Sequence, residues 1–269
     1  MKKELNYLEI NKASWNKRTI SHLDSDFYDV KGFLKGNNSL NDIELALLGD
    51  VKGKSILHLQ CHFGQDTISL ARMGAKVTGV DLSNKAIESA NELAKKSGVE
   101  AEFICCDIYD LPKHLDKKYD IVFTSYGTIG WLPDIAKWSE IVFQYLNGKG
   151  TFVFVEFHPV VWMFDDDFTK VKYTYHKSDP IIEFETGSYA NKDAQLNQDC
   201  VTWNHGLGEV IGSLLESGLT LKSFKEYDYS PYNCFNNTIE SAPKQFRIKH
   251  MENKLPMVYS LTAVKPHSK

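Results

Sequence analysis

Two carboxylates follow neighbouring apolar runs of the sequence, and their positions suggest a nucleoside site. Asp81 ends the run that begins at residue 76, and Asp107 follows the run that begins at residue 102. A carboxylate after a second strand can accept from both hydroxyls of a ribose, and one after a third strand can accept from an adenine amino group. Ligands of open parallel sheets lie outside the carboxyl ends of the strands. The pair therefore predicts an adenosine-containing ligand at that edge.

The elements that must position these carboxylates alternate along the chain from residue 51. Short apolar runs that predict strands cover 55–59, 76–81, 102–106, 119–124 and 150–155, and helical spacing covers 65–72, 84–96 and 138–146. This alternation indicates a parallel sheet with right-handed crossovers. A helix near 207–215 and two late strands, 219–227 and 258–265, follow, with about thirty residues of turn-like sequence between the strands. We expect the late strands to add an antiparallel pair to one edge.

Length, charge, apolar runs and cysteine content limit the classes of protein to which the chain can belong. The chain has 269 residues and a net charge of −4, which suits one large domain and gives no electrostatic support for binding nucleic acid. Neither an apolar run long enough to span a membrane nor an apolar leader after Met1 is visible. The five cysteines include no C-x-x-C pair, which favours reduced thiols and a cytoplasmic location.

Taken together, the motifs resemble those of the class I S-adenosylmethionine (SAM)-dependent methyltransferases over residues 51–157. The segments 77–83, 105–108 and 146–152 match the family's pattern well. The first loop departs from it, because Gly64 is the only one of the usual three glycines, and Gln60 and His62 stand at the other two positions. His58 replaces the usual acid and is expected to be a packed, hydrogen-bonded core residue.

The resemblance implies an α/β fold. It predicts a seven-stranded, mostly parallel Rossmann-like sheet with helices on both faces, an antiparallel last strand, an N-terminal helical cap and an aromatic-rich insertion after strand five. It also implies that Asp81 holds the ribose of SAM and that Asp107 faces the adenine. The full set of predicted cofactor-binding residues is Gln60, Cys61, His62, Gly64, Asp81, Leu82, Asp107, Ile108, Ser125 and Arg18.

Two alternative functions remain open beside methyl transfer. A nicotinamide-linked oxidoreductase is disfavoured, because side chains at residues 60, 62 and 65 fill the positions where a pyrophosphate approaches glycines. A non-catalytic SAM-binding regulator would keep the same motifs. His58 and His62 straddle a strand end and a loop, and residues 165–167 indicate a solvated acidic turn, so we predict no metal site.

The methyl acceptor is predicted to be a small molecule. Ser125 to Thr128 lacks the prolines of the clamp that related enzymes use for amino groups of bases. If the acceptor is protic, it needs a base. His158 is the first candidate because its ordinary pKa lies near neutrality, although His158 and Pro159 could instead simply end the strand. Tyr126, Glu156 and His62 are the others.

We divide the predicted single domain of residues 1–269 into four segments. Residues 1–50 form an N-terminal cap, 51–157 the SAM-binding core, 158–202 an insertion, and 203–269 the last part of the sheet. The insertion is dense in aromatic residues. It therefore suits either a lid over a ring-bearing acceptor or the interface of a homodimer, and the sequence leaves both open.

Overall fold

The computed structural model describes residues 6–267, and seven of its strands form one sheet. In their order across the sheet, the strands are β3 (Glu102–Cys105), β2 (Lys76–Asp81), β1 (Ser55–Leu59), β4 (Tyr119–Ser125), β5 (Leu146–Phe157), β11 (Val258–Val264) and β8 (Thr220–Tyr227). β11 is antiparallel to both of its neighbours, and the other pairs with a described register are parallel. The predicted fold class is therefore confirmed.

The helices and the smaller hairpins complete the architecture. The α-helices are α1 (Tyr7–Leu23), α2 (Val30–Leu34), α3 (Asp42–Leu48), α4 (Gln65–Arg72), α5 (Asn84–Ser97), α6 (Ile135–Tyr145) and α7 (Leu207–Glu216). Four short 3-10 helices are η1 (Ile108–Lys113), η2 (Ile129–Trp131), η3 (Val161–Met163) and η4 (Lys249–Met251). Two hairpins are formed by β6 (Ile181–Thr186) with β7 (Asn197–Thr202) and by β9 (Thr238–Ala242) with β10 (Gln245–Ile248).

The chain divides into two compact units, each assembled from separated segments. The first unit comprises the chain up to residue 40 together with 51–116 and 180–202, and the second comprises 41–50, 117–179 and 203–269. Neither unit coincides with the four segments into which we divided the sequence, and the prediction of a single domain stays a prediction.

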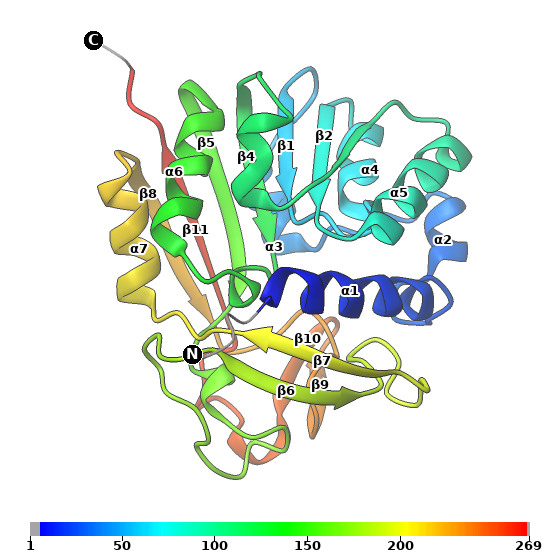
Figure 1. The fold of residues 1–269 in the computed structure, drawn as a ribbon, viewed down its shortest axis with the longest axis vertical. Coiled ribbons are helices and arrows are strands. Elements are labelled where there is room, and N and C mark those ends of the chain that lie inside the picture. Colours follow the sequence, from blue (N-terminus) through cyan, green and yellow to red (C-terminus); the bar gives the residue numbers. More distant parts are fainter. Residues whose placement is uncertain (1–5, 268–269) are drawn as a thin grey trace. The chain divides into compact units, whose positions relative to one another are not determined.

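The first unit contains β1, β2 and β3 with their intervening helices. α5 begins at Ser83, whose side chain accepts from the N–H of Ala86, and ends at Gly98, whose φ is 67°. Its apolar face buries Ile87 and Leu93 among other residues. α1 runs beside the β6–β7 hairpin (Figure 1), and the side-chain amide of Asn11 exchanges two hydrogen bonds with the backbone of Val201. The hairpin thus belongs with the N-terminal helix.

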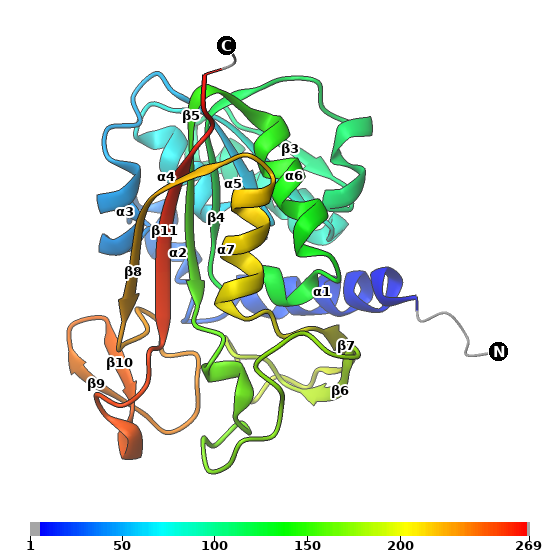
Figure 2. The same ribbon diagram turned by 90° about the vertical axis from the view of Figure 1, so that its left-hand side faces the viewer.

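The second unit contains the other four strands of the sheet, with α6 and α7 next to each other (Figure 2). α6 begins earlier than predicted, because the side chain of Asp134 accepts from the N–H of Lys137 and caps the helix there. Around the end of β5, an apolar cluster includes Phe157, Phe235 and Val258.

The prediction for residues 228–257 was wrong in part. We predicted turns throughout, but β9 and β10 form a hairpin there. Both strands are short and carry charged and polar residues, so their alternation is weak. Residues 1–5, where we expected no leader, lie outside the described residues. Among residues 6–267, no helix has the length and apolar character that a membrane span requires.

Candidate functional site

The loop after β1 has the backbone of a glycine-rich loop although it holds one glycine. φ is 55° at Gln60, 51° at His62 and 78° at Gly64. Left-handed backbone costs a residue other than glycine about 1–3 kcal/mol, so a loop that holds it at Gln60 and His62 is shaped by its surroundings. At Gly64 a Cβ would lie 2.8 Å from the ring of Phe103, so a side chain there would force that ring to move. The alternating positions are those at which the resemblance places glycines.

Asp81 joins this loop to the end of β2. Its Oδ2 accepts from the N–H of His62 and its Oδ1 from the N–H of Ser83, both at 2.8 Å. Burial raises the pKa of Asp81 to about 6, although backbone N–H groups of Ser83, His62 and Leu82 favour the charged form. An ionised carboxylate has about four acceptor positions. Asp81 can therefore shape the loop and still accept from a ligand hydroxyl.

Asp107 follows β3 and caps the short helix η1. Its Oδ1 accepts from the N–H of Tyr109 at 3.2 Å, and Ile108 beside it is buried. Cys61 is also buried, and burial raises the pKa of its thiol well above the ordinary value. Leu82 is half-buried. These four predicted residues thus lie in the first unit with Gln60, His62, Gly64 and Asp81.

Arg18 is buried in α1 and contacts protein groups of the β6–β7 hairpin. Its Nη2 lies 2.5 Å from Oε2 of Glu185 and 3.1 Å from Sγ of Cys200. Burial lowers the pKa of Arg18, but Glu185 and Cys200 outweigh burial and leave it raised. These contacts tie α1 to the hairpin. The cofactor contact predicted for Arg18 stays a prediction.

Aromatic and histidine side chains gather over the first loop, and we call Trp15, His22, Tyr28, His62 and Tyr189 the histidine–aromatic cluster. Ring centroids lie 5.3 Å apart for Trp15 and His62, 5.2 Å for His22 and Tyr28, and 4.9 Å for His22 and Tyr189. The two imidazoles meet, with Nδ1 of His22 2.9 Å from Nε2 of His62. Sequence reasoning missed Tyr189, because its neighbours in this cluster are far away along the chain.

In the second unit, Ser125 ends β4 and Tyr126 follows it at a φ of 45°. The hydroxyl of Tyr126 donates to Oε2 of Glu44 at 2.8 Å, and Glu44 is fully buried in α3. The ring of Tyr126 also packs against that of Tyr232. Tyr126 is thus held at both its backbone and its hydroxyl, and Ser125 beside it is half-buried.

Glu156 organises the loop after β4 from the neighbouring strand. Its carboxylate accepts from the N–H groups of Gly127, Thr128, Ile129 and Phe157 and from the hydroxyl of Thr128. The side chain is 2% exposed, and burial raises its pKa. Five donors exceed the usual capacity of a carboxylate. The structure therefore gives Glu156 a positioning role, and its use as a base stays a prediction.

His158 lies at the end of β5, where its ring is enclosed. Nδ1 accepts from the N–H of Val160 at 3.2 Å, and Nε2 lies 2.9 Å from Oε1 of Glu226. Burial lowers the pKa of His158, and Glu226 opposes that shift. The structure places His158, Tyr126 and Glu156 in the same unit.

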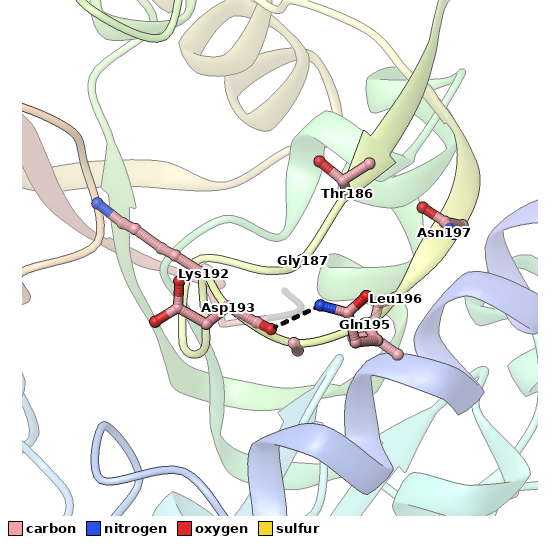
Figure 3. A pocket seen from close by; sticks show the side chains of 8 residues that line it. Thr186, Gly187, Lys192, Asp193, Gln195, Leu196 and Asn197 are labelled. Atoms are coloured by element: carbon pink, nitrogen blue, oxygen red, sulfur yellow. Dashed lines mark hydrogen bonds between the residues drawn. The ribbon is translucent and has the colours of Figure 1, made fainter.

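We assign no function to three other features: His58, possible metal-binding clusters, and a hollow in the turn between β6 and β7. His58 is buried with Nδ1 2.8 Å from Oγ1 of Thr67, as expected for a core residue. Within residues 6–267, no three His, Cys, Asp or Glu side chains converge to hold a metal ion. A polar hollow of about 340 Å³ lies in the turn between β6 and β7, lined by Thr186, Gly187 and residues 192–197 (Figure 3). None of the predicted site residues lines it.

Comparisons with known proteins agree with the motifs. Residues 56–150 match the family described as a methyltransferase domain. An uncharacterized methyltransferase, YbaJ, of Bacillus subtilis is 23% identical over 192 residues, which cover 70% of this chain and 74% of that protein. A ubiquinone biosynthesis O-methyltransferase of Salmonella typhi is 28% identical over 141 residues, 47% of this chain and 58% of that protein.

A solved structure shares the fold. The crystal structure of an S-adenosylmethionine-dependent methyltransferase from Mesorhizobium loti superposes with a TM-score of 0.58 at 20% identity, and the match covers 86% of this chain and all of that one. The chain spans 58% of the length of the ubiquinone-related protein, so the match reaches only part of that relative.

Proposed function

We propose that this chain is a class I SAM-dependent methyltransferase that transfers a methyl group from SAM to a small-molecule acceptor. The observation that carries the proposal is the first loop with Asp81. The backbone is left-handed at residues 60, 62 and 64, and the carboxylate of Asp81 accepts from the N–H groups of His62 in this loop and of Ser83. A carboxylate beside the loop suits an uncharged sugar better than a phosphate, which it would repel.

The residues of the first unit fit the cofactor. Asp81 retains acceptor capacity for the hydroxyls of a ribose, and Asp107 offers a carboxylate to an adenine amino group. The loop 60–64, with its left-handed turns, would hold the amino-acid part. When bound, SAM supplies a methyl group on a cationic sulfur.

A small-molecule acceptor is supported by two observations. The net charge of −4 removes the attraction on which nucleic-acid binding depends. Several curated relatives are named for O-methyl transfer in ubiquinone biosynthesis, a reaction of a small molecule. Of the second unit's predicted residues, Tyr126 and His158 contact protein groups, Glu44 and Glu226, so their contact with an acceptor is part of the proposal, and Glu156 would act by holding the loop after β4.

Titration calorimetry tests the cofactor. We expect S-adenosylhomocysteine (SAH) and SAM to bind and NAD not to bind. Binding of NAD without SAH would favour the oxidoreductase and overturn the proposal.

A second assay tests the transfer itself. The protein is incubated with methyl-labelled SAM and either a metabolite extract or bulk nucleic acid and protein. Label should enter a small molecule, which mass spectrometry would then identify. SAM binding without any label transfer would favour a regulator, and label in the macromolecules would contradict the small-molecule acceptor.

A further inference from the structure

A continuous chain of hydrogen bonds runs from the first loop to the turn after β6. Nε2 of His62 lies 2.9 Å from Nδ1 of His22, and Nε2 of His22 lies 3.0 Å from Oγ of Ser188. Oγ of Ser188 also accepts from the N–H of Asn191 at 3.2 Å. The other end is Nδ1 of His62, which is buried and makes no hydrogen bond to any of the described residues.

Both rings are neutral. Burial, with a contribution from Arg18, lowers the pKa of His22 to about 3, and burial likewise lowers the pKa of His62 well below its ordinary value. Each imidazole therefore carries one proton, on one of its two nitrogens. The direction of the chain depends on which nitrogen that is.

Two arrangements satisfy the His22–His62 contact, and they differ at Nδ1 of His62. If His22 donates, His62 must carry its proton on Nδ1, where a buried N–H would have no acceptor. If His62 donates from Nε2, His22 donates onward to Ser188, and Nδ1 of His62 holds a lone pair. A buried donor or acceptor without a partner costs about 1–3 kcal/mol, but in folded proteins orphaned N–H donors are rarer than under-satisfied acceptors. The second arrangement is therefore favoured.

The surroundings define what Nδ1 can bind. The ring of His62 is packed by Phe63 at 4.4 Å, Trp15 at 5.3 Å and Tyr28 at 5.5 Å between centroids. Its own backbone N–H is bound to Asp81. A lone pair among aromatic rings, at a loop that the proposed function assigns to the cofactor, accepts a hydrogen bond but resists taking a full proton.

We infer that Nδ1 of His62 accepts a hydrogen bond from an N–H or O–H group of a ligand at the first loop, and that His22 and Ser188 are positioning residues that fix its tautomer. The inference rests on the proposed function for the identity of the ligand. The donor is either the ammonium group of the amino-acid part of SAM or the protic group of the methyl acceptor.

The tautomer is measured first, without ligand. Nitrogen-15 NMR of the imidazoles should show His62 protonated on Nε2 and His22 protonated on Nε2. Ser188→Ala should change the His22 signals, and Ser188→Thr should restore them. His114→Gln, a substitution at an exposed histidine, is the control and should leave both unchanged. A proton on Nδ1 of His62 would overturn the inference, whether or not the protein binds SAH.

The ligand donor is identified with His62→Phe, which keeps an aromatic ring but removes the lone pair. Loss of one hydrogen bond corresponds to about a tenfold effect. If the cofactor is the donor, the variant binds SAH about tenfold more weakly but binds methylthioadenosine, which lacks the amino-acid part, as tightly as the parent. If the acceptor is the donor, both affinities are unchanged and label transfer falls about tenfold. Unchanged binding and unchanged transfer would overturn the inference.

The two experiments also distinguish a failure of this inference from a failure of the proposed function. Failure of the parent protein to bind SAH would sink the proposed function alone, because the tautomer result does not depend on SAH. Parent-like SAH binding with the opposite tautomer would sink the role of His62 alone.

Discussion

Asp81 and Glu156 are both strand-end carboxylates that organise a loop, but they differ in how fully their oxygens are used. Asp81 accepts from the N–H groups of His62 and Ser83, one on each oxygen at 2.8 Å, the N–H of Leu82 also favours its charged form, and the residue is half-buried. Glu156 takes five donors and is almost fully buried. A strand-end carboxylate can therefore accept from a ligand where acceptor capacity is left, as we propose for Asp81, and positions a loop where it is not, as at Glu156.

The largest difference that we expect between variants of these two carboxylates is in folding stability. Glu156→Ala leaves five donors without their acceptor, and we expect a loss on the order of 4 kcal/mol in the free energy of unfolding. Asp81→Ala should lose less than half as much. Urea denaturation measures both, with Glu140→Ala on an exposed face of α6 as the control. Equal losses would erase the distinction between the two carboxylates.

Cofactor affinity should show the reverse order. Asp81→Asn keeps the size of the side chain but removes its charge, and we expect SAH to bind about 30-fold more weakly, since charge-assisted hydrogen bonds contribute about 1.5–3 kcal/mol each. Calorimetry measures the affinity, and Glu92→Gln on the exposed side of α5 is the matched control. An Asp81→Asn protein with parental affinity would contradict the placement of the ribose.

The dependence of affinity on pH sharpens the role of Asp81. Because the folded pKa is raised to about 6, the carboxyl is mostly protonated at pH 5 and ionised at pH 7.5. Ribose hydroxyls donate to the ionised form, so SAH should bind about tenfold more weakly at pH 5 than at pH 7.5. His22, whose pKa is about 3, stays neutral over this range. The Asp81→Asn variant should lose this dependence; a variant that retains it would implicate another group.

The raised pKa of Asp81 should make folding stability change with pH in the opposite direction to cofactor affinity. A raised carboxyl pKa means that the folded protein holds a proton between about pH 4 and 6 that the unfolded chain releases. The contribution of Asp81 to stability is therefore fully present below about pH 4 and is lost as pH rises through 6. Comparing parent and Asp81→Asn by urea denaturation across this range isolates that contribution.

The sequence predicted those features whose signals lie within one short segment of the chain. α5 could be recognised from its apolar spacing, its cap at Ser83 and its end at Gly98, all within one segment. The contact between His22 and His62 joins residues 40 positions apart, and that between His22 and Ser188 joins residues 166 apart. Neither has a local signature, because packing of α1 and the β6–β7 turn brings the side chains together.

Glu156 is a second residue whose role the sequence alone could not predict. Its position at a strand end was visible in the sequence, but its role depends on N–H groups of residues 127–129, which fold back on it. The number of donors around a carboxylate depends on the folded conformation of the loop, so it cannot be counted from the sequence. Residue type and position therefore indicated a site, and the hydrogen bonds distinguish a carboxylate with acceptor capacity left, Asp81, from one whose oxygens are fully used, Glu156.

The smallest effect concerns the backbone of the two loops, each of which holds a residue other than glycine at positive φ, 55° at Gln60 and 45° at Tyr126. Gln60→Gly removes left-handed strain of about 1–3 kcal/mol and adds unfolded-chain entropy of about 1 kcal/mol. We expect a net gain of about 0–2 kcal/mol in unfolding free energy. Gln144→Gly, within α6, lacks the strain and should lose about 1 kcal/mol. Equal losses in urea denaturation would mean that Gln60 makes contacts that outweigh its strain, and that the first loop is built on its side chain and not on its turn.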